Sequence, residues 1–253
     1  MLTSAIQFAY LTRLGDTALI LSQRLAELCG KGPALEEDIA LTNTALDLLG
    51  QARLWLTYAG EVEAAGRDED ALAYLRGDRE FHNFLLVEQP NCNYAHVLVR
   101  QFYFDVWHNL ALFRLESSAD PRIAEIAAKS RKEAAYHLSR SSGLIVRLGD
   151  GTAESRSRMA SAAVSLWPYT GEFFRADFVD STMADAGLAF DPGSLRDEWL
   201  RCVRQVFEPA TLSMPPLDAW MHNGGKQGRH TEHLSYLLAE MQVLHREFPG
   251  AAW

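Results

Sequence analysis

Apolar residues recur every three or four positions along most of the chain, the spacing that places side chains on one face of an α-helix. The first such segment contains Leu11, Leu14, Ala18, Leu21, Leu25 and Leu28. The stretch from Cys29 to Pro33 breaks this pattern, because glycine frees the backbone and proline cannot continue a helix. The spacing therefore predicts a long first helix that ends near residue 28.

The segment from residue 35 to about residue 66 carries two apolar stripes instead of one. The first stripe is Leu35, Ile39, Thr42, Leu46, Leu49 and Leu56, and the second is Leu41, Ala45, Leu48, Ala52 and Trp55. A helix that is apolar on two sides usually lies between neighbours that cover both. We therefore expect this second helix to be central in the fold.

Helical patterns continue to the end of the chain. A third long helix is predicted from about Tyr94 to Ser117, and a fourth begins at Asp120-Pro121, an N-cap residue followed by proline, and runs to Leu148. Shorter helices are predicted over residues 68–75, 152–174, 175–186, 193–208 and 229–247. Strand-like alternation is scarce. Two long helix pairs joined by a longer crossover predict an all-α fold, a four-helix bundle with additional C-terminal helices.

Length and charge narrow the range of functions. The chain has 253 residues, so we expect a single domain, with a core bundle over about residues 3–149 and extra helices over about 152–247. Its net charge of −9 argues against binding to nucleic acid or to anionic membranes. The three cysteines are far apart in sequence, and there is no signal peptide or apolar run long enough to span a membrane. These features favour a cytoplasmic protein.

A four-helix bundle raises the question of a di-iron centre. Ferritin-like di-iron proteins take one Glu from each of two helices and a Glu-x-x-His motif from each of the other two. Asp105/His108 is nearly the only acid-x-x-His pair in the chain. Alignment of the two helix pairs as a pseudo-repeat gives six degenerate ligand positions: Asp16, Leu48 and Gln51 in the first pair, and Asp105, Ala134 and His137 in the second.

Three of these six positions lack a suitable ligand, since leucine and alanine cannot coordinate iron and a glutamine amide is a poor replacement for imidazole. Too few ligands remain for two irons, so we predict no catalytic residue, no metal site and no cofactor. Asp105 and His108 are most simply a hydrogen-bonded pair within one helix. His137 is more typical of a satisfied core histidine than of a solitary ligand.

A glycine-rich stretch, Asn223-Gly224-Gly225-Lys226-Gln227-Gly228-Arg229, precedes the last predicted helix. Backbone N–H groups at a helix start can face an anion, so this loop is a candidate phosphate-binding loop. Loops of this composition are also common connectors between helices. Both interpretations remain open from the sequence.

Several segments, in the same order and spread over nearly the whole chain, resemble one family. They include residues 13–25, 45–53, 85–91, 132–137, 224–226, 230–234 and 239–242, and the terminal Pro249-Gly250 to Trp253. Together they resemble the PaaC-type subunit of the bacterial ring 1,2-phenylacetyl-CoA epoxidase. The resemblance implies a ferritin-like, non-catalytic subunit without a functional di-iron site.

The resemblance also implies partners. They are a homologous di-iron subunit, which epoxidises the aromatic ring of phenylacetyl-CoA with O₂, and a flavin and iron–sulfur reductase that supplies electrons from NADPH. Two alternatives remain. One is a di-iron or di-manganese oxygenase with atypical ligands, and the other is a regulatory module that contacts coenzyme A through Lys226 and Arg229.

Overall fold

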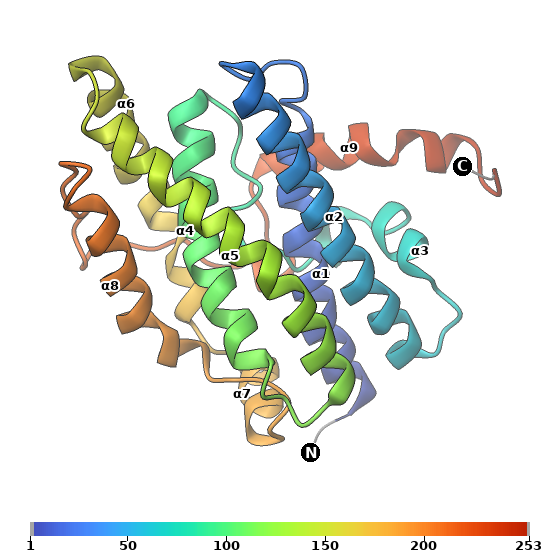
Figure 1. The fold of residues 1–253 in the computed structure, drawn as a ribbon. Helices are drawn as coiled ribbons and strands as arrows, with labels where there is room; N and C mark the ends of the chain where they lie inside the picture. The colour runs from blue at the N-terminus through green and yellow to red at the C-terminus, as the bar shows by residue number, and fades with distance from the viewer. Residues whose placement is uncertain (1–2, 252–253) are drawn as a thin grey trace. The chain divides into compact units, whose positions relative to one another are not determined.

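The computed structural model describes residues 3–251, and every regular element among them is a helix (Figure 1). The expected all-α, ferritin-like fold class is confirmed. Two compact units are present, one formed by Met1–Pro90 with Gly224–Trp253 and the other by Asn91–Asn223. The single-domain organisation stays a prediction. Within the described residues, no helix has the length and hydropathy needed to cross a membrane.

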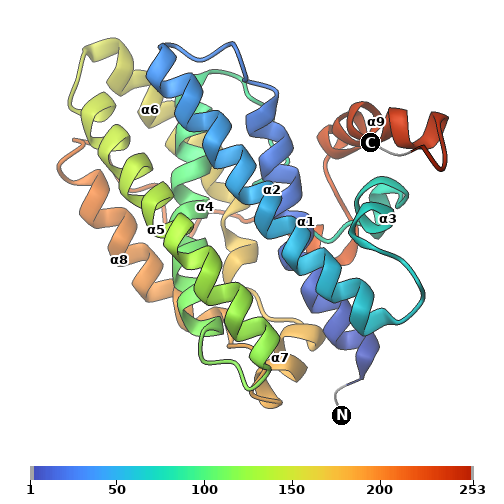
Figure 2. The same ribbon diagram turned by 45° about the vertical axis from the view of Figure 1, so that its right-hand side comes forward.

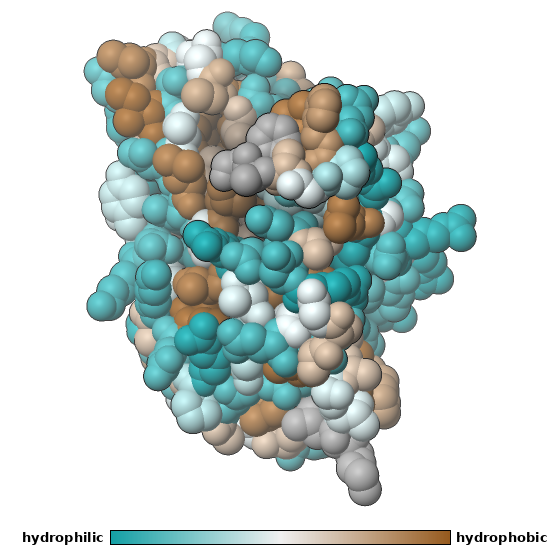
Figure 3. Space-filling view, turned by 90° about the vertical axis from the view of Figure 1, so that its right-hand side faces the viewer, coloured by the Kyte–Doolittle hydropathy of each residue, from teal (hydrophilic) through white to brown (hydrophobic). Residues whose placement is uncertain are grey.

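The first unit is built around one long helix pair. Its helices are α1 (Ser4–Ala26), α2 (Leu35–Glu63), the short α3 (Glu69–Tyr74) and the C-terminal α9 (Glu232–Glu247), with 3₁₀ turns η1 (Asp78–Glu80) and η5 (Gly225–Gln227). Figures 1 and 2 both show α1 and α2 side by side and running in opposite directions. In Figure 3, the face that includes α3 and α9 carries apolar side chains in patches separated by hydrophilic ones.

Two contacts explain how closely α1 and α2 pack. A Cβ placed on Gly15 would lie 2.7 Å from the side chain of Leu56, so only glycine permits this approach. Further along α1, the hydroxyl of Ser22 donates to the backbone carbonyl of Ala45 at 2.8 Å. The helix pair is therefore held by apolar packing and by a buried polar bond.

The two apolar stripes of α2 differ in burial within the first unit, and the central position of this helix stays a prediction. The second stripe is buried, as expected, with Leu48 fully inaccessible. The first stripe is exposed over most of its length, including Leu35, Ile39 and Leu46, and only Leu56 at its end is buried. The sequence pattern records that both faces are apolar, but it does not say what covers them.

The second unit contains the other long helix pair and the remaining helices. Its elements are α4 (Tyr94–Leu115), α5 (Pro121–Gly149), α6 (Ala153–Leu166), η2 (Trp167–Tyr169), η3 (Gly171–Phe174), α7 (Phe178–Asp185), η4 (Pro192–Leu195) and α8 (Arg196–Phe207). The predicted start of α5 is confirmed, since the Asp120 carboxylate accepts from the Arg122 and Ile123 backbone N–H groups. The helix predicted over 152–174 ends earlier, where Pro168 interrupts the hydrogen-bond ladder.

Aromatic side chains form the core of this second unit. Tyr103 of α4 lies 5.6 Å from Trp199 of α8 and 5.7 Å from Trp167, measured between ring centroids. The Trp199 indole N–H donates to the Tyr103 carbonyl at 3.0 Å. The extra helix α8 is therefore anchored to the long pair by the largest side chains of the chain.

Candidate functional site

The first set of degenerate ligand positions lies in the α1–α2 unit and contains a buried ion pair. Asp16 of α1 is fully buried, and both of its carboxylate oxygens accept hydrogen bonds from the guanidinium of Arg76, with 3.1 Å between Nη1 and Oδ2. The backbone N–H of His82 donates to Oδ2 as well, at 2.9 Å. Arg76 also donates to the Glu80 carbonyl at 2.8 Å and lies over the ring of Phe81. The positive charge beside Asp16 therefore comes from the chain itself.

This set does not fit a metal. Leu48 and Gln51 of α2 are both buried, so the position expected for glutamate presents an apolar side chain and that for histidine a neutral amide. The one carboxylate present is already paired with arginine at both oxygens. No step that depends on iron can be assigned to these residues.

The second set lies between α4 and α5 and is held by different contacts. Asp105, fully buried, accepts from the Gln101 amide and from the Ser141 hydroxyl, both at 2.7 Å. The expected hydrogen bond between Asp105 and His108 is absent, which corrects that prediction. The partner of Asp105 is the residue four positions earlier on α4 together with one from the facing helix.

Burial controls the ionisation of this second set. Loss of solvent raises the pKa of Asp105 to about 6, although the nearby His137 charge and the bonds from Ser141 and Gln101 act in the opposite direction. Burial also lowers the pKa of His108 to about 3, and the charge of His137 adds to this effect. His108 is therefore neutral at physiological pH.

The second set also lacks the expected donors for iron. Ala134 is fully buried at the position expected for glutamate, and His137, which is 2% exposed, is the one imidazole at a matched ligand position. Across residues 3–251, no group of three or more His, Cys, Asp or Glu side chains is placed to hold a metal ion. The donor chemistry of both sets thus differs from that of a di-iron centre.

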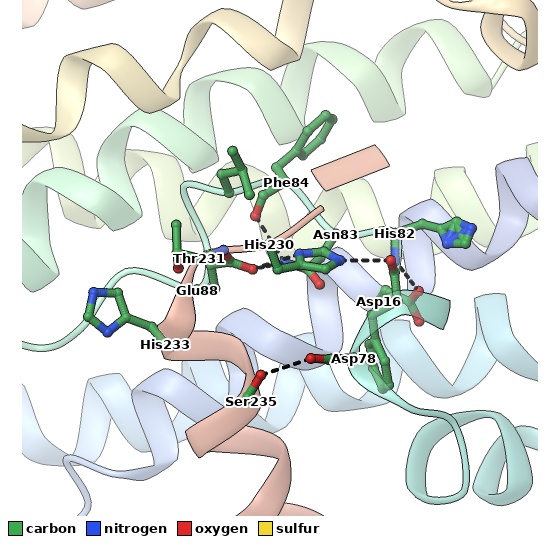
Figure 4. A network of polar contacts seen from close by, with 12 residues as sticks. Asp16, Asp78, His82, Asn83, Phe84, Glu88, His230, Thr231, His233 and Ser235 are labelled. Atoms are coloured by element: carbon green, nitrogen blue, oxygen red, sulfur yellow. Dashed lines mark hydrogen bonds and ion pairs between the residues drawn. The ribbon is translucent and has the colours of Figure 1, made fainter. Parts of the chain in front are cut away.

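Another buried polar network, centred on Glu88 and His230, joins two distant segments of the first unit (Figure 4). The sequence analysis did not predict it. The fully buried carboxylate of Glu88 accepts from the Thr231 backbone N–H at 2.6 Å and from the Asn83 amide at 3.0 Å, and it lies 2.9 Å from Nδ1 of His230. The other ring nitrogen of His230 lies 2.8 Å from the Phe81 carbonyl. The residues just before α9 are therefore fixed to the segment that follows η1.

The geometry assigns the charge of His230. Both ring nitrogens face oxygen acceptors, so each must carry a hydrogen for both bonds to form. Burial alone would lower the pKa of His230, but the hydrogen bond and charge of Glu88 outweigh it and raise that pKa above its usual value. The two segments that meet here both belong to the motifs carrying the family resemblance, which was the available signal in the sequence.

The glycine-rich loop contributes mainly to this packing. Gly228 has φ +70°, and a Cβ there would lie 2.2 Å from the Arg79 carbonyl oxygen, so the position requires glycine. Lys226 is 6% exposed, whereas Arg229 is exposed. Because Lys226 is buried, it has little surface on which an anion from solution could bind. The contact with coenzyme A stays a prediction, and Arg229 is the more accessible of its two candidate residues.

Comparison with known proteins identifies the family. The sequence matches the family described as "Phenylacetic acid catabolic protein" over residues 3–253. The chain belongs to this family. It is also 50% identical, over 245 residues, to a 1,2-phenylacetyl-CoA epoxidase subunit of Escherichia coli (strain K12), a match that covers 97% of this chain and 98% of the relative. The resemblance inferred from the motifs is thereby confirmed for this member of the phenylacetic acid catabolic protein family.

Proposed function

We propose that the protein is a structural, non-catalytic subunit of a phenylacetyl-CoA epoxidase. In this role it pairs in the cytoplasm with a homologous di-iron subunit that performs the epoxidation and receives electrons from a flavin and iron–sulfur reductase. The similarity to the Escherichia coli epoxidase subunit supports the pathway and the complex. The paired Asp16 and Arg76 support the non-catalytic role.

The ion pair carries this proposal because it occupies a ligand position with a fixed positive charge. An arginine cannot lose its proton in a protein, so a metal ion could bind Asp16 only after the guanidinium had moved away. The buried Leu48 and Ala134 act in the same direction, since neither side chain offers a donor. The fold of the bundle is kept while its metal chemistry is lost.

Reconstitution of the complex tests this role. The di-iron subunit is purified alone and with this chain, and the rate of phenylacetyl-CoA epoxidation and the iron content of each subunit are measured. We expect iron in the partner only, and a soluble, active partner only when this chain is present. Full activity of the partner alone would reject the structural role. Iron at about two atoms per copy of this chain would instead support an oxygenase with atypical ligands.

Contact with coenzyme A is a second candidate role. The exposure of Arg229, at the end of the glycine-rich loop, supports it. Replacement of Arg229 by Gln removes the charge. If the side chain touches the phosphates of the substrate, this change raises KM for phenylacetyl-CoA without altering assembly. Unchanged kinetics would remove this role and leave the structural one intact.

A further inference from the structure

The C-terminal helix α9 is bonded to one stretch of the first unit, residues 73–88, which we define as the docking segment. Near the end of α9, the Gln242 amide donates to the Arg76 carbonyl at 3.0 Å. Near its start, the hydroxyl of Ser235 donates to the Asp78 carboxylate at 2.9 Å. Both halves of α9 are therefore tied to the same stretch of chain.

The docking segment has anchors of its own on α1. The Arg76 guanidinium pairs with both carboxylate oxygens of Asp16, and the backbone N–H of His82 donates to that carboxylate at 2.9 Å. The side chain of Arg24 donates twice to the Glu88 carbonyl, at 3.0 Å and 2.8 Å. Since none of these bonds involves α9, the docking segment would stay on α1 if α9 moved away.

Apolar burial along α9 is confined to its first half. Leu234, Leu237 and Leu238 are buried, but Gln242 is the one buried residue of this helix after them, and Val243 is 42% exposed. Few buried apolar contacts together with hydrogen bonds near the surface are features of elements that open locally while the core stays folded. The helix α9 has both features.

His230 lies where the chain enters α9, two residues before the helix begins, and its side chain is 5% exposed. Both of its bonds are to the docking segment, with Nδ1 at 2.9 Å from Glu88 and Nε2 at 2.8 Å from the Phe81 carbonyl. A neutral imidazole carries one N–H, so one of these two acceptors would lose its donor. Because a buried acceptor without a donor is costly, the neutral form favours separation of His230 from the docking segment.

The charges around His230 favour its protonated form. The ionisable groups that face it from the docking segment and α1 are Glu88, Asp78, His82 and Asp16, the last of these paired with Arg76. Burial lowers the pKa of His230, but Glu88 and Asp16 outweigh this and raise that pKa above its usual value. Burial also lowers the pKa of His82, so this neighbour is neutral where His230 is charged. The stability that the His230 bonds supply is therefore present at low pH and is lost as the pH rises.

We propose that His230 is the latch of a pH-sensitive switch, in which residues 230–247 lie docked while its imidazole is protonated and open from the docking segment as one unit once it is neutral. Opening exposes Leu234, Leu237 and Leu238, which the docked state buries. The α1–α2 pair and the docking segment stay folded in both states, because their anchors lie outside α9. The switch belongs to this chain alone and does not depend on the structural role proposed above.

Hydrogen–deuterium exchange of the full chain tests the switch, measured at pH 6.5, 7.5 and 8.5 and corrected for the intrinsic exchange rate at each pH. From pH 6.5 to pH 8.5 the protection of α9 amides should fall about tenfold, as expected when a bond to a charged group is lost, while that of α1 and α2 amides changes less than twofold. In His230→Asn, α9 should be weakly protected already at pH 6.5 and should show no further dependence on pH.

His233→Asn is the matched control, because His233 is a histidine three positions along whose ring points away from Glu88 and His230 (Figure 4). It should keep the pH dependence of the unaltered chain. An equal fall in the protection of α1, α2 and α9 would place the titration in global unfolding and overturn the latch. A pH dependence that persists in His230→Asn would assign it to another group, with the same consequence. If His230→Asn does not fold, the unaltered chain still decides, since protection of α9 that is independent of pH would reject the proposal.

Discussion

Replacement of Arg76 by Met tests whether the Asp16–Arg76 pair holds the first unit together. The change removes the guanidinium that contacts both carboxylate oxygens and keeps an apolar stem of similar length. It strands a carboxylate in a site where Asp16 is 0% and Arg76 4% exposed. Breaking a buried pair in this way costs about 3–5 kcal/mol. The remaining bond from the His82 N–H favours the lower half of that range, so we expect a loss of about 3–4 kcal/mol.

The assay is urea unfolding at pH 7.5, followed by circular dichroism. Arg53→Met is the matched control, because Arg53 makes an ion pair with Glu69 at 3.0 Å but its side chain is 75% exposed. An exposed pair contributes about 0–1 kcal/mol, so the control should change the free energy of unfolding by no more than that. Adding Asp16→Asn to Arg76→Met should recover about half of the loss, since it removes the stranded charge. Equal effects of Arg76→Met and Arg53→Met would refute the reasoning.

Three further changes test other parts of the structure. Replacement of His230 by Asn should cost most stability below pH 6.5 and progressively less as the pH rises. The pKa of His230 is raised in the folded protein, so the stability it contributes is lost as its imidazolium releases a proton. Thermal unfolding from pH 6 to pH 9 measures this loss. The Asp105 carboxyl, whose pKa is raised from 3.8 to about 6, destabilises the fold once it is ionised. The free energy of unfolding of Asp105→Asn, relative to that of the unaltered protein, should therefore increase by about 2–3 kcal/mol from pH 4 to pH 7. A difference in urea midpoint that does not vary with pH would contradict this prediction. Leu48→Glu should lower the free energy of unfolding by at least about 3 kcal/mol, because the new carboxylate would be fully buried at this position, and the variant should still bind no iron; urea unfolding and metal analysis check the two results.

The helices were predictable because their signals are local. The three- and four-residue spacing of apolar positions and the Asp120-Pro121 start depend on neighbours in sequence, and both agree with the structure. The exposure of the first stripe of α2 was not predictable, because periodicity reports which faces are apolar and not what lies against them. An apolar stripe at the surface has the same sequence pattern as one in the core.

The candidate site was predictable only in part. Leu48 and Ala134 could be recognised from spacing, because ligand positions follow the helical repeat. Arg76 could not, since it lies 60 residues from Asp16 and outside the long helices. The same holds for His230, which meets Glu88 across 142 positions of sequence. Pairings of this kind depend on how the chain returns on itself, which no short motif encodes.

The arginine beside Asp16 gives this buried carboxylate a counter-charge that does not depend on a metal ion. A bundle whose buried carboxylates wait for metal has an incomplete interior until the ion arrives, and its folding then depends on delivery of that ion. Here Arg76 of the same chain supplies the positive charge beside Asp16, so this buried carboxylate is neutralised as soon as the first unit folds. Under the structural role proposed above, a cell short of iron would still accumulate this protein in its folded form.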